Sequence, residues 1–262
     1  MSSLLDILAA TRAPLTFGGR CRVACQLCAV TAVMGITTVL MMLAGLLTLF
    51  QARRFYTEVL ARGLGRIVLW ICGVRVVVHQ DSPLPSGQVV YVSNHTSTLD
   101  CFVLIALGLP NARFFLSGFL RKNPFICIMG YLTGTIWTVP QSFPEKRRQI
   151  FQRAERILRR TGESVYLSPE GERIRTGEIG HFNKGAFHLA TSLRAPLVPF
   201  YIAVPPETDP GLGIDVRPGT VHVYFQPPIR TVDWHLADLE RNRTNVREFF
   251  VQLHEQRRLI AR

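Results

Sequence analysis

A run of about 28 residues without a charged side chain, from Val23 to Phe50, constrains this chain more than any other feature. A helix needs about 20 apolar residues to cross the hydrocarbon core of a bilayer, and this run exceeds that length. It is too long for the core of a signal peptide, and no small-residue cleavage site follows it, so we expect it in the mature protein. Arginines flank both ends and leave its orientation open. The run predicts an apolar helix over residues 23–50 that crosses a membrane once or lies within its surface.

Residues 52–72 have the pattern of a basic amphipathic helix, with apolar side chains on one face and arginines between them. A helix packed on a globular domain with solvated arginines would show the same pattern. Because the stretch follows the apolar run directly, we favour a helix that lies on a membrane. Residues 1–72 are therefore expected to form a membrane anchor, and residues 73–262 to form a single domain of ordinary size.

The formal net charge of +12 fits three kinds of partner: nucleic acid, an anionic membrane surface, or phosphorylated ligands. The chain has no zinc-finger spacing and no aromatic RNA-binding motif, so we expect no nucleic-acid partner. Cys25 and Cys28 have C-x-x-C spacing, but no further metal ligands lie near them in the sequence. We interpret them as small apolar residues of the anchor, in reducing, cytoplasmic surroundings.

Beyond Gly73, short runs of β-branched and aromatic residues alternate with helical patterns. This alternation predicts an α/β fold with a mixed, partly parallel central sheet flanked by helices, preceded by the membrane-anchoring helical segment. The strands are expected at residues 74–79, 89–93, 113–117, 135–139, 164–167, 197–203 and 220–225, and the helices at 98–107, 144–160, 184–193 and 234–260.

The sequence from Asn94 to Asp100, NHTSTLD, directly follows an apolar strand and opens a helix. Active sites of α/β proteins lie at such strand ends. Asp100 lies close enough along the chain to bind one ring nitrogen of His95, so that the other nitrogen can take a proton. No G-x-S-x-G nucleophile motif is present, which favours direct attack by a substrate hydroxyl. The alternative is a hydrogen-bonded pair at a helix start with no catalytic role.

The sequence SPEGER, residues 168–173, also directly follows a strand. Its Pro and Gly predict a sharp turn that brings Glu170 and Arg173 to one cleft, where an arginine can bind phosphate. Lys184, at the start of a later helix, is placed to contact an anion beside free backbone N–H groups. A solvated turn and an exposed lysine are the simpler interpretations of these two segments.

Together these segments resemble the glycerolipid acyltransferase family, typified by lysophosphatidic acid acyltransferase. The family's N-H-x-x-x-x-D motif is matched in full, and its F-P-E-G-T-R motif is matched except at Ser168 and Glu172. The segment beginning at Phe182 matches F-x-x-G-A, and the strand between Pro196 and Pro199 matches the family's last motif. The order and spacing agree over residues 73–230, and the combination is far more specific than any one motif.

The resemblance implies a membrane-bound enzyme that moves a fatty acyl group from acyl-CoA or an acyl carrier protein to the hydroxyl of a lysophospholipid such as 1-acyl-glycerol-3-phosphate. It implies no metal and no bound cofactor, and a catalytic domain on the cytoplasmic side of the inner membrane. His95 would be the base and Asp100 would orient it. The implied substrate-binding residues are Asn94, Glu170, Gly171, Arg173 and Lys184.

One position departs from the family pattern. Pro140 stands where the second motif has an arginine that is taken to bind the acceptor's phosphate. Losing a charge-assisted contact costs about 1.5–3 kcal/mol of binding, unless another basic residue such as Arg121, Lys122, Arg173 or Lys184 compensates. Three alternatives therefore remain: an acyltransferase for a lysolipid without phosphate, such as a lyso-amino lipid, a membrane-anchored lipid esterase or thioesterase, and a lipid-binding protein without catalysis.

Overall fold

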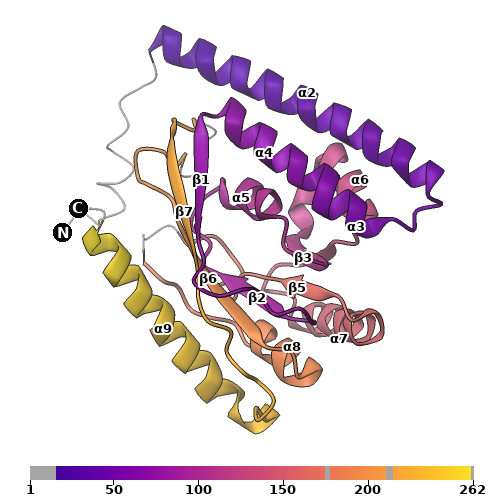
Figure 1. The fold of residues 1–262 in the computed structure, drawn as a ribbon, viewed down its shortest axis with the longest axis vertical. Helices are drawn as coiled ribbons and strands as arrows, with labels where there is room; N and C mark the ends of the chain where they lie inside the picture. Colours follow the sequence, from indigo (N-terminus) through magenta and orange to yellow (C-terminus); the bar gives the residue numbers. More distant parts are fainter. Residues whose placement is uncertain (1–15, 175–177, 211–214, 261–262) are drawn as a thin grey trace.

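A computed structural model describes residues 16–174, 178–210 and 215–260. The first 15 residues of the expected anchor and the last two of the expected globular domain lie outside the described residues. The rest folds around one twisted sheet covered by helices on both faces (Figure 1).

The sheet has seven strands in the order β1-β7-β6-β2-β5-β3-β4. Every neighbouring pair is parallel except β6 and β7, so the sheet is mixed, as the sequence predicts. The four strands β2, β5, β3 and β4 therefore end at the same edge. The strand bounds are β1 Val74–His79, β2 Val90–Ser93, β3 Ala112–Ser117, β4 Ile136–Thr138, β5 Ser164–Tyr166, β6 Leu197–Ala203 and β7 Gly219–Phe225.

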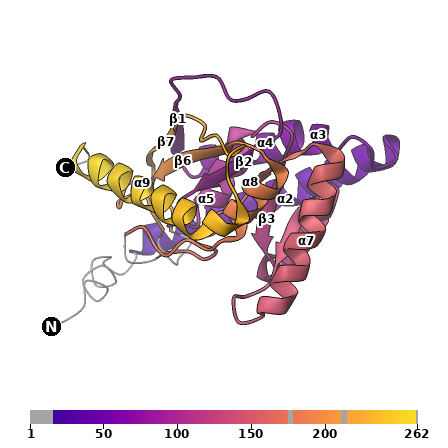
Figure 2. The same cartoon turned by 90° about the horizontal axis from the view of Figure 1, so that it is seen from below.

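The helices form two layers on opposite faces of the sheet (Figures 1 and 2). The first layer is α2 Phe17–Leu47, α3 Arg53–Phe55, the π-helix η1 Tyr56–Ala61, α4 Arg62–Ile71, α5 Asp100–Leu107, the 3-10 helix η2 Gly118–Lys122 and α6 Pro124–Leu132. The second layer is α7 Pro144–Thr161, α8 Gly185–Leu193, the 3-10 helix η3 Leu236–Asp238 and α9 Leu239–Ile260.

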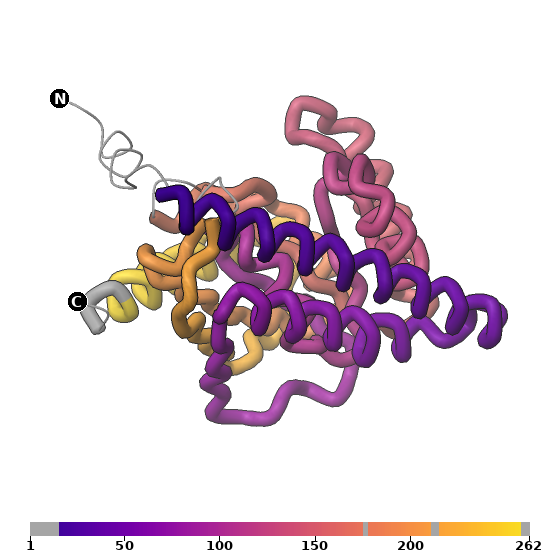
Figure 3. Tube along the Cα trace, turned by 90° about the horizontal axis from the view of Figure 1, so that it is seen from above, coloured from indigo at the N-terminus to yellow at the C-terminus, as the bar shows by residue number. Residues whose placement is uncertain are grey.

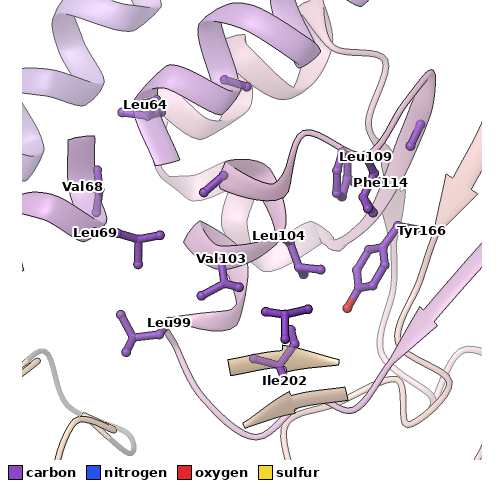
Figure 4. Packing of buried hydrophobic residues seen from close by; sticks show 14 of the residues in the cluster. Leu64, Val68, Leu69, Leu99, Val103, Leu104, Leu109, Phe114, Tyr166 and Ile202 are labelled. Carbon is purple, nitrogen blue, oxygen red and sulfur yellow. The ribbon is translucent and has the colours of Figure 1, made fainter. Parts of the chain in front are cut away.

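Alternate residues of each central strand contribute to two separate cores, because successive side chains of a strand point to opposite faces. Tyr91 of β2 and Tyr166 of β5 belong to the core beneath α4 and α5, while Val90 and Val165 belong to the core beneath α7 and α8. The first core is drawn in Figure 4, where apolar side chains of α4 and α5 lie above Ile202, with Tyr166 beside those of α5.

Helix α2 runs lengthwise beside α4 on the outside of the first layer (Figures 1 and 3). It packs against both α4 and α6. Near its start, Arg22 forms an ion pair with Asp215, and near its end Gly45 approaches the side chains of Phe50 and Leu132. The helix is thus fastened to the domain along its length rather than projecting from it.

The expected elements agree with the structure within a few residues, apart from four differences. The apolar helix begins six residues earlier than expected and ends three residues earlier. The amphipathic stretch is divided by one π-helical segment. The last helix begins at Leu239, after a 3-10 turn, rather than at residue 234. Helices η2 and α6 were not expected, since the apolar run of α6 has no helical period, although Asn123 caps it and Pro124 occupies its first turn.

Candidate active site

The turn between β2 and α5 holds His95 against a buried carboxylate. His95 Nδ1 lies 2.9 Å from Asp100 Oδ2, and the same oxygen accepts hydrogen bonds from the backbone N–H groups of Thr96 and Ser97, each at 2.9 Å. The Asp100 side chain is 0% exposed, whereas that of His95 is 31% exposed. Three donors on one oxygen fix the carboxylate, and the carboxylate fixes the tautomer and orientation of the ring.

The local sequence explains why the turn forms. Ser93 ends β2 and Asp100 is the first residue of α5, where a negative side chain interacts favourably with the positive end of the helix dipole. The six intervening residues are short and polar apart from Leu99, which is buried in the first core. Leu99 thereby anchors the end of the turn while His95 stays at its open side.

The loop after β5 holds the main chain of His95 on both sides. Glu170 Oε2 accepts a hydrogen bond from the His95 N–H at 2.7 Å, and the His95 carbonyl accepts one from the Ile174 N–H at 2.9 Å. Glu170 Oε1 accepts a third hydrogen bond, from the Gly180 N–H at 2.9 Å. Glu170 is only 2% exposed. It therefore orders the loop and the histidine rather than facing solvent.

The carboxyl group of Glu170 titrates far from its ordinary range. Burial raises the pKa of Glu170 from 4.5 to about 7, although the hydrogen bonds from Gly180 and His95 and the nearby His95 ring partly oppose the shift. Desolvation wins because a charge in an apolar surrounding loses more hydration than two neutral donors replace. Protonation of this group near neutral pH would weaken the acceptors that hold His95.

Gly171 allows the sharp turn that follows Glu170. Its φ is +74°, a region that residues with a side chain rarely adopt, and a Cβ there would lie 2.8 Å from Asn183 Nδ2. That Nδ2 donates hydrogen bonds to the carbonyls of Glu170 at 2.8 Å and Pro169 at 3.2 Å. Asn183 thus secures the loop from the start of α8.

Arg173 is brought to the same turn as His95. Its Nη1 donates a hydrogen bond to Thr98 Oγ1 at 2.7 Å. Thr98 lies between His95 and Asp100 in the chain, so the guanidinium approaches the histidine turn.

The side chains of Asn94 and Lys184 are engaged elsewhere. Asn94 is buried, and its Nδ2 and Oδ1 bind the carbonyl and the N–H of Ile202 at 2.9 and 2.8 Å, which joins the end of β2 to β6. Lys184 is exposed and forms a 2.8 Å ion pair with Glu240 of α9.

Two residues of the site were missed by reasoning from the sequence. Asn183 supports the Glu170 loop, and Asp209 accepts a 2.6 Å hydrogen bond from Ser97 Oγ. Asn183 lies inside a recognisable motif, which could have identified it. Asp209 lies more than 100 residues from the histidine turn and carries no local signal. Nowhere in the described ranges do three His, Cys, Asp or Glu side chains gather to hold a metal ion.

A partly exposed histidine with a buried aspartate partner, at the carboxyl edge of an α/β sheet, defines a protein equipped for general-base chemistry. The sequence of residues 75–203 matches the family described as Acyltransferase. The chain is 29% identical over 184 residues to a 1-acyl-sn-glycerol-3-phosphate acyltransferase of Limnanthes douglasii, and this alignment covers 68% of this chain and 62% of that protein. It is 32% identical over 155 residues to the chloroplastic enzyme LPAT1 of Arabidopsis thaliana, covering 56% and 41%.

The fold matches the crystal structure of the 1-acyl-sn-glycerophosphate (LPA) acyltransferase PlsC from Thermotoga maritima, with a TM-score of 0.68 and 20% identity, over 89% of this chain and 98% of that one. The chain is therefore similar to glycerolipid acyltransferases, and residues 75–203 carry the match to the Acyltransferase family. It spans less than two thirds of the length of the Limnanthes and Arabidopsis proteins.

Proposed function

We propose that this protein transfers a fatty acyl group from a thioester donor to the free hydroxyl of a lysophospholipid. The observation that carries the proposal is the 2.9 Å contact between His95 and the buried carboxylate of Asp100 at the carboxyl edge of the sheet. The Limnanthes and Arabidopsis relatives are both 1-acyl-sn-glycerol-3-phosphate acyltransferases, which supports 1-acyl-sn-glycerol 3-phosphate as the acceptor.

In the proposed reaction, His95 acts as the general base. Its Nδ1–H donates to Asp100, and in the described part of the chain no hydrogen bond occupies Nε2. Nε2 therefore takes the proton of the acceptor hydroxyl as the oxygen attacks the thioester carbonyl carbon. The new C–O bond forms, the C–S bond breaks, and the leaving thiolate takes the proton back from the imidazolium. This step needs no metal and no bound cofactor.

We assign the remaining site residues by their contacts. Glu170 and Gly171 position the main chain of His95, and Arg173 is the candidate for an anionic group of either substrate. Asn94 and Lys184, whose polar groups pair with Ile202 and Glu240, are assigned to holding the structure.

A second arginine supports an acceptor that carries a phosphate. Arg147 lies on the inward face of α7, and its Nη1 donates to the carbonyl of Val139 at 3.0 Å. The guanidinium therefore returns to the end of β4, next to Pro140, where the family has its motif-two arginine. Its other N–H groups supply the charge-assisted contacts that a proline cannot make.

The proposed membrane contact is the outer face of α2, which we place in the plane of the membrane rather than across it. The helix has a mean hydropathy of 2.2 over its most apolar window, and only 22% of that window is buried inside the protein. Its two ends are both held against the domain, as Arg22 and Gly45 show. Exposed apolar residues of α4 and α6 beside it, including Trp70 and Tyr131, extend the same surface.

The test is transfer to a panel of lysolipids with a labelled acyl donor, with products identified by mass. We expect diacyl product from a phosphate-bearing acceptor, and little free fatty acid when the acceptor is omitted. Hydrolysis that is indifferent to the acceptor would instead identify an esterase or thioesterase. Binding of lipids without turnover of any donor would identify a lipid-binding protein.

A further inference from the structure

Helix α7 carries a stripe of exposed positive charge that the proposed reaction does not use. The basic stripe consists of Lys146, Arg153, Arg156 and Arg160, which recur at spacings of seven, three and four residues and so lie on one side of the helix. All four are exposed, and among the described residues none of them forms an ion pair. The opposite side of the helix buries Ala154 and Leu158. Packing of α7 therefore does not require the stripe.

The stripe also surrounds a shallow hollow. Arg153, Arg156, Ile157 and Arg160 line a depression of about 290 Å³ on the outer side of α7. Of the two acidic residues of the helix, Glu155 lies within the stretch that lines this depression, and it is already paired with Arg159. The surface thus combines one apolar side chain with several uncompensated positive charges, which suits an acidic partner.

The position of α7 argues against a lipid surface as that partner. Helix α7 packs on the core of the second layer, and α2 packs on the core of the first layer, on the other face of the sheet (Figures 1 and 2). A membrane in contact with α2 therefore lies on the far side of the sheet from the basic stripe. The partner of the stripe is then a molecule that approaches from the water.

The stripe is nevertheless connected to the reaction edge. Helix α7 follows β4, whose end lies at the same edge of the sheet as the ends of β2 and β5. The segment before α7 also lies close to the Glu170 loop, since a Cβ on Gly171 would lie 3.4 Å from Gln141 Nε2. With a rise of about 1.5 Å per residue, Arg153 and Arg160 lie roughly 14 and 24 Å beyond the start of the helix. A thioester at the end of a long flexible arm can span that separation and reach the site, while the partner molecule that carries the arm stays bound at the stripe.

From these observations we propose that the basic stripe of α7 is the docking surface for an acidic acyl carrier protein, which delivers its acyl thioester to His95 on a flexible arm. The inference rests on the proposed function and specifies its donor. Complementary charge steers the carrier protein to the stripe, and it can dissociate after transfer because each exposed ion pair contributes little to affinity.

The experiment compares two triple variants of the full chain in detergent or nanodiscs. The test variant is Arg153→Gln/Arg156→Gln/Arg160→Gln, and the control is Arg75→Gln/Arg230→Gln/Arg241→Gln, which removes the same charge from exposed arginines outside α7. Glutamine keeps helix propensity close to that of arginine. Binding of fluorescently labelled holo-acyl carrier protein, KM for acyl-carrier protein, KM for acyl-CoA and binding to anionic vesicles are measured for each.

We expect only the test variant to change. Its affinity for the carrier protein should fall about tenfold or more, and its KM for the acyl carrier protein should rise by a similar factor, with KM for acyl-CoA unchanged. Equal losses with both donors would overturn the proposal, because the stripe would then bind the phosphates of CoA. Loss of vesicle binding in the test variant would overturn the proposal and favour a membrane as the partner. Equal carrier-protein binding by both variants would also overturn it, because the stripe would then not be the docking surface. Stripe-dependent binding without transfer from any donor would refute the proposed function but not the docking surface.

Discussion

The backbone N–H of His95 donates a 2.7 Å hydrogen bond to the carboxylate of Glu170, although 75 residues separate them in the chain. A second bond, from the Ile174 N–H to the His95 carbonyl, closes the other side. The position of the imidazole is therefore determined by two motifs together: Asp100 fixes the ring and the loop after β5 fixes the main chain. This arrangement makes the behaviour of Glu170 a sensitive probe of the site.

Replacing Glu170 by Gln should change how stability depends on pH. Burial raises the pKa of Glu170 from 4.5 to about 7, so between these values the folded protein holds more protons than the unfolded chain. Raising the pH through this window therefore lowers the free energy of unfolding of the wild type by up to about 3 kcal/mol. The Glu170→Gln variant should show no such loss from this position, because glutamine does not titrate. Thermal unfolding of both proteins from pH 4.5 to 8 measures the difference.

Glu172→Gln is the matched control, because Glu172 is exposed two residues further along the same loop. Its pH dependence of stability should follow the wild type. A Glu170→Gln curve that runs parallel to the wild type across the whole range would show that Glu170 does not titrate as its burial implies.

Asn94→Ala should destabilise the fold. The substitution leaves both the N–H and the carbonyl of Ile202 without their partner in a buried site, at a cost of about 2–4 kcal/mol. Asn123→Ala removes an exposed helix cap and should cost only about 1 kcal/mol. Chemical denaturation of the two variants compares them; equal and small losses would refute the structural role of Asn94.

Arg147→Gln should weaken binding of a phosphate-bearing acceptor. Removing a charge-assisted contact raises KM for that acceptor by about 10- to 100-fold, with a smaller effect on an acceptor that lacks phosphate. Arg148→Gln, on the exposed side of the same helix, should leave both values unchanged. If Arg147→Gln raised KM equally for both acceptors, the guanidinium would not be the substitute for the arginine that Pro140 displaces.

The in-plane placement of α2 can be tested by labelling. In a cysteine-free variant, single cysteines placed at Thr16 and Gln51, both exposed at opposite ends of the helix, should react with a membrane-impermeant maleimide from the same side of sealed vesicles. Labelling of one position only from outside and the other only after permeabilisation would establish that the helix crosses the bilayer.

The sequence predicted the parts of the site that depend on local pattern. The strand-to-helix turn at Asn94–Asp100 was recognisable because an apolar strand, a histidine and a helix-starting aspartate occur within a few residues. The seven strands followed from β-branched runs bounded by turn residues. The resemblance to a family then linked two motifs that the spacing alone could not place together.

The parts that depend on tertiary contact were not predictable in the same way. Nothing local indicates that both polar groups of Asn94 pair with Ile202, or that Asp209 reaches Ser97. Lys184 showed the pattern of an anion-binding residue at a helix start, yet its described ion pair is with Glu240. Whether a polar side chain binds substrate or protein is decided by residues that lie far away in the sequence.

The measurement that tests the account most directly is the single-turnover rate of acyl transfer to lysolipid in His95→Ala, with His181→Ala, an exposed histidine outside the pair, as the control. We expect His95→Ala to lose about 10²- to 10⁴-fold in rate while its melting temperature and vesicle binding stay close to the wild type. His181→Ala should transfer at the wild-type rate. A folded His95→Ala protein that transfers acyl groups as fast as the wild type would contradict the proposal that this imidazole is the base.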